Sequence, residues 1–234
     1  MICVNNIKKS FGTKVACDIQ SLQINKGEII GLVGNNGAGK TTLFRLMLDL
    51  LKPDSGEVLL KGINVRESEE WKNFIGAYIN EQFLIDYLTA NEYFELLAKI
   101  TGIGKEQLNA HRQKFEAFAN GELFDNGKLI RNMSAGNKQK VGIISALINN
   151  PEIVILDEPF NFLDPRSQNL MKAILQEYNS EHGTTIIVSS HNLTHTIDIS
   201  TRILLLEDGV VIKDYNKQDN WDLQELENYF STTV

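Results

Sequence analysis

Residues 28–42 read EIIGLVGNNGAGKTT, an apolar run followed directly by glycines, a lysine and two threonines. The segment from Gly34 to Thr41 satisfies the pattern G-x-x-x-x-G-K-[ST]. Glycines at these positions let the backbone wind tightly, so that successive N–H groups can surround phosphate oxygens at the start of a helix. The stretch therefore predicts a strand over 28–33, a phosphate-binding loop, and a helix from about residue 40 to residue 51.

The groups of this loop have separate expected tasks. The ammonium group of Lys40 reaches the β- and γ-phosphates of a nucleotide, and the hydroxyl of Thr41 is a ligand for Mg²⁺. An ordinary glycine-rich turn between strand and helix is the alternative, and the complete motif in its expected context disfavours it. The predicted nucleotide-binding residues of this segment are Gly34, Asn35, Asn36, Gly37, Ala38, Gly39, Lys40, Thr41 and Thr42.

Two adjacent carboxylates follow the apolar run at residues 153–156. Because side chains alternate along a strand, Asp157 and Glu158 are expected to point to different sides and to have different roles. Asp157 is suited to hold Mg²⁺ through water, and Glu158 to take a proton from an attacking water. Two solvated acids at a strand end are the alternative, which the phosphate loop earlier in the chain disfavours.

Residues 133–140, MSAGNKQK, resemble the LSGGQ signature of the nucleotide-binding subunit of ATP-binding cassette (ABC) transporters. They precede Asp157 in the order and at the approximate interval that are usual in that family. The resemblance covers almost the whole chain. Residues 161–164 resemble the D-loop, Phe11 resembles the aromatic residue that stacks on adenine, and His191 resembles the switch histidine.

The resemblance implies roles for these residues. Ser134, Gly136 and Asn137 would bind the nucleotide held by a partner cassette, and His191 would act in catalysis beside Glu158. Ser134 by itself is typical of a helix N-cap, and a serine in that place presents its hydroxyl, N–H groups and the helix dipole to an anion.

The sequence departs from the family pattern in two motifs. Aligned on its flanking residues, the Q-loop glutamine of the family falls at Asn80, a shorter amide that is the expected further ligand of the metal ion. Gln82 can replace it only if the loop shifts by two residues. In the signature, Ala135 stands at the first glycine and Asn137 at the glutamine, so slower turnover is expected.

The remaining pattern predicts an α/β fold with a P-loop NTPase core. Apolar runs at 153–156, 185–188 and 203–206 alternate with helix-like stretches, which indicates a buried, mostly parallel sheet covered on its faces. The dipeptide Asp208-Gly209 between apolar residues predicts a hairpin, and the first 25 residues predict further antiparallel strands at an edge.

Residues 89–131 show a helical pattern, with apolar residues at the spacing of one helix face, namely Tyr93, Leu96, Leu97 and Ile100. We interpret them as a helical insertion into a single ABC ATPase domain that spans residues 1–234. The nucleotide-binding core then consists of residues 1–88 and 132–234.

Charge and cysteine content disfavour several classes of protein. The chain has 23 basic and 30 acidic residues and a net charge of −7, the opposite of a surface that grips nucleic acid, so no nucleic-acid partner is expected. Cys3 and Cys17 form no pattern of a disulfide framework or structural zinc site, which fits a reducing cytosol. No apolar run approaches the ~18 residues of a membrane span.

The resemblance implies hydrolysis of ATP to ADP and phosphate, with Mg²⁺, by the motor subunit of a membrane transporter, most closely an exporter. The implied partners are a transmembrane permease and a second cassette, a copy of this chain or a related one, that pairs with it on ATP binding. The implied location is cytoplasmic, at the inner face of the cell membrane. A soluble ABC ATPase such as an iron–sulfur assembly subunit is the alternative, and only Asn80 and Ala135 suggest a non-hydrolysing regulatory cassette.

The segment 80–87 offers more apolar surface than a solvated loop needs. Phe83, Leu84, Ile85 and Tyr87 are predicted to line a groove that receives a cytoplasmic helix of the permease. Packing of these side chains against the helical insertion is the alternative.

Overall fold

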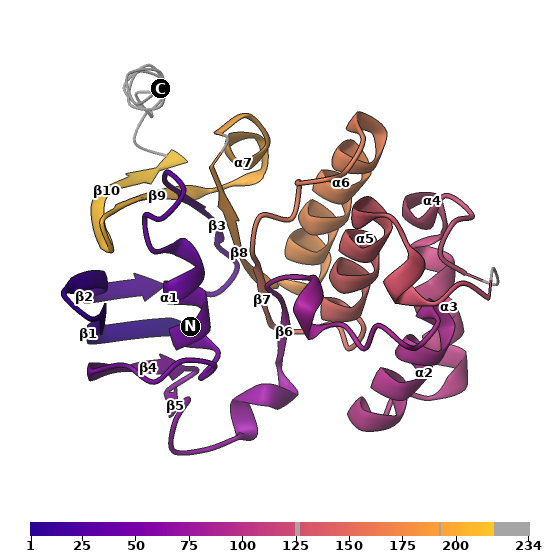
Figure 1. The fold of residues 1–234 in the computed structure, drawn as a ribbon, viewed down its shortest axis with the longest axis horizontal. Helices are drawn as coiled ribbons and strands as arrows, with labels where there is room; N and C mark the ends of the chain where they lie inside the picture. The colour runs from indigo at the N-terminus through magenta and orange to yellow at the C-terminus, as the bar shows by residue number, and fades with distance from the viewer. Residues whose placement is uncertain (125–126, 192, 218–234) are drawn as a thin grey trace.

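The computed structural model describes residues 1–124, 127–191 and 193–217. Two sheets with helices between and beside them form an α/β structure (Figure 1), which confirms the predicted fold class. The predicted division into a core and a helical insertion stays a prediction. Its last part, residues 218–234, lies outside the described residues, as do residues 125–126 and 192.

The larger sheet contains six strands in the order β10-β9-β3-β8-β7-β6. All neighbouring pairs are parallel except β10 and β9, which are antiparallel and joined through the predicted turn at Asp208-Gly209. Both turn residues have positive φ, 46° and 81°, as a two-residue hairpin requires. The bounds are β3 (Ile29–Val33), β6 (Ile75–Tyr78), β7 (Ile153–Leu156), β8 (Thr185–Ser190), β9 (Arg202–Glu207) and β10 (Val210–Asn216).

The second sheet is antiparallel and has the order β2-β1-β4-β5. Helix α1 (Lys40–Met47) lies between the two sheets, and its buried Leu43 and Phe44 belong to one apolar cluster with residues of both. This sandwich fixes the start of α1, and with it the phosphate loop, against the larger sheet. The strands are β1 (Ile2–Phe11), β2 (Lys14–Ile24), β4 (Ser55–Leu60) and β5 (Ile63–Asn64).

The other face of the larger sheet is covered by a second apolar cluster. Alternate side chains of β7 divide between the clusters: Val154 and Leu156 join this one, whereas Ile153 and Ile155 join the first. Helices α5 and α6 cover this face, and helices α2, α3 and α4 lie beyond them (Figure 1). The helices are α2 (Ala90–Thr101), α3 (Lys105–Lys114), α4 (Glu116–Ala119), α5 (Ala135–Ala146), α6 (Pro165–His182) and α7 (Leu193–Ile199), and the 3-10 turns are η1 (Glu70–Asn73), η2 (Glu81–Phe83) and η3 (Ile130–Asn132).

Two local predictions differ from the structure. Helix α1 ends at Met47, four residues before the predicted end at residue 51, because Asp49 has a left-handed backbone with φ 51° and the chain turns there. Ile100, predicted to lie on the apolar face of α2, is 71% exposed. Tyr93, predicted on the same face, is buried in the core, and Phe94, which lies outside the predicted spacing, is fully buried beside it.

None of the helices in the described part of the chain combines the length and the apolar character that a bilayer crossing demands.

His111 links the helical segment to α5 through a buried hydrogen bond. Its Nε2 donates to the carbonyl of Ile144 at a distance of 3.0 Å, and the residue is only 8% exposed. Burial lowers the pKa of His111 from 6.5 to about 4, the bond to Ile144 opposes this shift, and nearby Lys114 adds to it. The folded protein therefore holds His111 neutral, whereas the unfolded chain takes up a proton below pH 6.5.

We predict that protonation of His111 in the unfolded chain lowers the free energy of unfolding by up to roughly 3 kcal/mol as the pH falls from 6.5 towards 4. Above pH 6.5 the full stability is retained, because His111 is then neutral in both states. His111→Gln keeps an N–H donor for Ile144 and cannot titrate in this range. Urea unfolding at pH 7, 6 and 5 should therefore give a shallower pH dependence for the variant. Equal slopes for variant and wild type would contradict the prediction.

Candidate active site

The loop between β3 and α1 places an open helix start and a buried ammonium group together. Gly39 precedes α1, and no side chain caps the first turn, so its N–H groups are available to an anion. Lys40 is 6% exposed, and its Nζ donates to the carbonyls of Gly34 at 2.6 Å and Asn35 at 3.2 Å. Carbonyl groups of the loop itself thus hold the lysine in place.

Gly39 is required by the backbone at this point. Its φ is 107°, a conformation that side chains with a Cβ rarely adopt, and a Cβ here would also collide with the carbonyl of Ala16 in β2. The N–H of Gly209, in the turn between β9 and β10, donates to Ala38 at 2.8 Å. The phosphate loop is therefore packed between β2 and the hairpin of β9 and β10.

Asp157 is the buried acid at the end of β7. Its two carboxylate oxygens accept hydrogen bonds from Thr41 Oγ1 and from Ser189 Oγ, and each donor–acceptor distance is 2.5 Å. Burial raises the pKa of Asp157, and the hydrogen bonds from Ser189 and Thr41 oppose that rise. The first turn of α1 and the carboxyl ends of β7 and β8 are thus joined at one carboxylate.

Glu158 faces a different set of partners. Its Oε2 accepts from Nδ1 of His191 at 2.9 Å and from the His191 backbone N–H at 3.3 Å, and its Oε1 lies 3.4 Å from Lys40 Nζ. The two acids do point apart, but strand alternation is the wrong reason. Strand β7 ends at Leu156, and the left-handed backbone of Glu158, with φ 47°, turns its side chain away.

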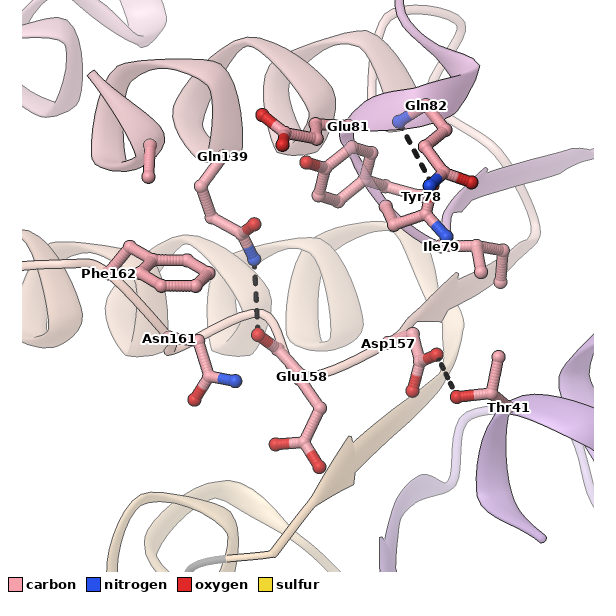
Figure 2. A pocket seen from close by; sticks show the side chains of 12 residues that line it. Thr41, Tyr78, Ile79, Glu81, Gln82, Gln139, Asp157, Glu158, Asn161 and Phe162 are labelled. Carbon is pink, nitrogen blue, oxygen red and sulfur yellow. Dashed lines mark hydrogen bonds between the residues drawn. The ribbon is translucent and has the colours of Figure 1, made fainter. Parts of the chain in front are cut away.

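Two hollows meet at Glu158. One of about 420 Å³ contains Thr41, Asp157, Glu158, Asn161 and Gln139, together with residues 78–82 (Figure 2). The other, of about 340 Å³, is lined by Phe11 and residues 36–42 and reaches Glu158 from the phosphate-loop side. Phe11 is 55% exposed there, so its ring is accessible above the loop. The structure therefore brings most of the predicted loop, Phe11 and both acids around a continuous site.

The signature residues begin helix α5. Ser134 caps it, and its Oγ accepts from the N–H of Asn137 at 3.2 Å. Gly136 lies under the carbonyl of Phe162, where a Cβ would come within 2.6 Å of that oxygen. Ala135 borders the larger hollow, but no residue of 133–140 is among the described residues that line the hollow at the phosphate loop.

Asn80 borders the larger hollow but uses its amide locally. Its Oδ1 accepts from the N–H of Gln82 at 3.0 Å and so caps the short turn η2. The side chain of Asn80 is therefore engaged in a contact within its own loop, and Gln82 borders the same hollow.

Sequence reasoning missed two residues of the site, Ser189 and Gln139. Ser189 binds Asp157 and also accepts from the Glu158 N–H at 2.8 Å, while the Gln139 Nε2 donates to the Glu158 carbonyl at 3.1 Å. Gln139 lies within the signature stretch 133–140, and Ser189 lies two residues before His191. Their contacts join residues far apart in the chain, so no local pattern indicated them.

Oxygen donors for a divalent cation are present beside the phosphate loop. The hydroxyl of Thr41 and the carboxylate of Asp157 are the hard ligands that Mg²⁺ prefers. Within the described ranges there is no group of three or more His, Cys, Asp or Glu residues that could hold a metal by itself. The arrangement fits a cation that takes few protein ligands and completes its shell with substrate phosphates and water.

Comparisons with known proteins agree with this geometry. The family model described as "ABC transporter" matches residues 17–161. The chain is 33% identical over 225 residues to the bacitracin transport ATP-binding protein BcrA of Enterococcus faecalis, covering 92% of this chain and 69% of that protein. It is 31% identical over 234 residues to the lantibiotic transport ATP-binding protein SrtF of Streptococcus pyogenes, covering 97% and 96%.

A solved structure shows the same arrangement of elements. It is a dimeric post-hydrolysis state of the ATP-binding cassette MJ0796 bound to ADP and Pi, with a TM-score of 0.81, 27% identity, and coverage of 92% of this chain and 98% of that one. The resemblance inferred from the motifs is confirmed. The chain belongs to the ABC transporter family and is an ATP-hydrolysing cassette, the motor component of a membrane transporter.

Proposed function

We propose that this cassette drives export across a membrane by Mg²⁺-dependent ATP hydrolysis, paired with a second cassette and attached to a transmembrane permease at the inner face of the cell membrane. The observation that carries the hydrolytic part is the convergence of Lys40, Glu158 and His191 beside the Thr41–Asp157 pair. The relatives named for bacitracin transport and lantibiotic transport support the transport part. No relative named here supports the iron–sulfur alternative.

Nucleotide phosphates replace internal partners in this proposal. Lys40 exchanges the carbonyls of Gly34 and Asn35, and its ion pair with Glu158, for phosphate oxygens. The uncapped N–H groups of α1 contribute further donors and the positive end of the helix dipole. The exposed ring of Phe11 supplies a face on which adenine can stack.

Glu158 acts as the general base. When Lys40 turns to the phosphates, the carboxylate is free to accept a proton from a water that attacks the γ-phosphate. His191 holds the carboxylate by its backbone N–H and its ring N–H, which fixes the direction of the carboxylate, and the ring N–H can instead donate to a phosphate oxygen. Mg²⁺, held by Thr41 and through water by Asp157, would neutralise charge on the phosphates, with Asn80 available only if it leaves the N–H of Gln82.

A second cassette completes the site. The signature residues are absent from the described lining of the phosphate-loop hollow, yet Ser134 and the N-terminus of α5 present an anion-binding end. This supports a head-to-tail pair in which Ser134, Gly136 and Asn137 of one chain contact the ATP bound to the other. The similar cassette in the post-hydrolysis state is likewise a dimer.

The permease contact is assigned to part of segment 80–87. Phe83 and Tyr87 are 50% and 66% exposed, whereas Leu84 is buried in the core of the helical side and Ile85 packs against it. The prediction that all four side chains line a groove is therefore wrong for Leu84. Exposed aromatic rings on a loop are suited to pack against the apolar face of a partner helix.

The first test removes the charge of the phosphate loop. We expect Lys40→Ala to abolish ATPase activity and to weaken ATP binding by roughly 10- to 100-fold, because charge-assisted hydrogen bonds to phosphate are lost. Binding is measured by calorimetry and hydrolysis by phosphate release. Lys8→Ala, which removes an exposed ion pair with Asp18, is the matched control and should behave as wild type. Unchanged binding and turnover in Lys40→Ala would overturn the assignment.

The second test separates ATP binding from hydrolysis. Glu158→Gln keeps the shape of the side chain but cannot accept a proton, so hydrolysis should slow by about 10²–10⁴-fold while binding remains. The two ATP molecules should then stabilise the pair of cassettes, and size-exclusion chromatography should show a dimer with ATP and Mg²⁺ but a monomer with ADP.

The control for this variant is Glu152→Gln. Glu152 lies just before the other end of β7 and pairs with Lys61 on the surface, so its loss should leave turnover unchanged. Wild-type turnover in Glu158→Gln would remove Glu158 from the role of base. A monomer under every nucleotide condition would contradict the shared site.

The third test concerns the permease. Charged substitutions at both exposed rings, Phe83→Asp and Tyr87→Asp, should abolish co-purification with the co-expressed permease and leave basal ATPase activity within about twofold, because the rings contact solvent in the isolated chain. Ile100→Asp, at a residue that is 71% exposed on α2, is the matched control and should retain the permease. Retained binding in the double variant would place the contact elsewhere.

A further inference from the structure

Gln139 is a buried amide that reaches the main chain of Glu158 from another element. It lies in the second turn of α5 and is 6% exposed. Figure 2 shows its side chain extending from the helix to the loop after β7, where Nε2 donates to the Glu158 carbonyl at 3.1 Å. Burial of an amide is costly unless it is hydrogen-bonded, so this contact accounts for the position of the side chain.

The backbone of Glu158 needs such support. Its φ of 47° is unusual for a glutamate, because the Cβ crowds the following carbonyl in this conformation. Three hydrogen bonds hold the residue on its two sides. The N–H donates to Ser189 at 2.8 Å, and the carbonyl accepts from Gln139 and from the N–H of Asn161 at 3.2 Å.

Helix α5 is in close contact with this loop along its first turns. The carbonyl of Phe162 approaches Gly136 so closely that a Cβ there would be 2.6 Å away. On its other side, α5 is tied to η2 by the ion pair of Lys138 and Glu81, 2.9 Å long. The helix that carries the signature therefore also contacts the loop that holds the proposed base of its own chain.

We propose that Gln139 is a positioning residue for ATP hydrolysis: its amide fixes the left-handed main chain of Glu158, and thereby directs the carboxylate towards Lys40 and His191. The inference rests on the proposed role of Glu158 as base. In this arrangement, α5 presents its N-terminus to the nucleotide of the partner and holds the base for the nucleotide of its own chain. A shift of α5 relative to the sheet then alters both sites.

The test replaces the amide by a thioether of similar length. We expect Gln139→Met to lower kcat about tenfold, the size of effect that loss of one hydrogen bond can produce, and to leave KM for ATP within about twofold. Lys40 and the phosphate loop do not depend on the amide, so binding is retained. Gln139→Leu, which also lacks the donor, should likewise lower kcat and leave KM nearly unchanged. Circular dichroism is used to establish that both variants are folded under the conditions of the assay.

The matched control is Gln168→Met. Gln168 in α6 donates its Nε2 to the carbonyl of Phe160 at 3.2 Å, so this substitution removes the same kind of contact two residues away from Glu158. Its kcat should equal that of the wild type. An equal loss in Gln168→Met, an unchanged kcat in both Gln139 variants, or a parallel change of kcat and KM would overturn the proposal.

A double substitution distinguishes this inference from the role of Glu158. If Gln139 acts through the carboxylate, Gln139→Met should change the residual rate of Glu158→Gln by less than about twofold. A further tenfold loss in that background would show that Gln139 acts by another route. If Glu158→Gln itself hydrolyses ATP at the wild-type rate, the role of base fails; if only the Gln139 variants are normal, the positioning role alone fails.

Discussion

The buried carboxylate of Asp157 joins three elements at the carboxyl edge of the larger sheet. It accepts hydrogen bonds from Thr41 at the start of α1 and from Ser189 near the end of β8, while the residue itself follows β7. An unpaired carboxylate at this depth would be strongly destabilising, so both donors must be present for the strand ends and the helix to pack as they do. The start of α1, which follows the phosphate loop, is thereby joined to the ends of β7 and β8 through one carboxylate.

Close to Asp157, Lys40 and Glu158 form an ion pair. Their side chains lie 3.4 Å apart, and both have further partners, the loop carbonyls for Lys40 and His191 for Glu158. In the proposed mechanism, the phosphates of ATP take the place of Glu158 as partners of Lys40, so that nucleotide binding makes the acid available for reaction. The carbonyls of Gly34 and Asn35, together with Glu158, limit the cost of burying the ammonium group.

Local patterns were sufficient for the elements around the site. The phosphate loop, the parallel strands and the Asp208-Gly209 hairpin depend on backbone geometry and on burial of alternate side chains, and both leave a trace in neighbouring residues. The patterns failed where distant segments decide. The apolar spacing of α2 included Ile100, which is exposed because no element of the described part of the chain covers that end of the helix face. Leu84, in contrast, is buried because it packs into the apolar cluster of the helical side.

Sequence patterns were enough to predict the family, the α/β class and the residue types proposed to bind phosphate and activate water, because a glycine-rich loop and paired acids at strand ends have a fixed local chemistry. The orientation of these residues depends on contacts between distant segments. Ser189 and Gln139 reach Asp157 and Glu158 from other elements, 32 and 19 positions away, and the direction of Glu158 follows from a left-handed backbone that those contacts hold. Such hydrogen bonds depend on how helices and strands pack, which no spacing of residues along the chain encodes.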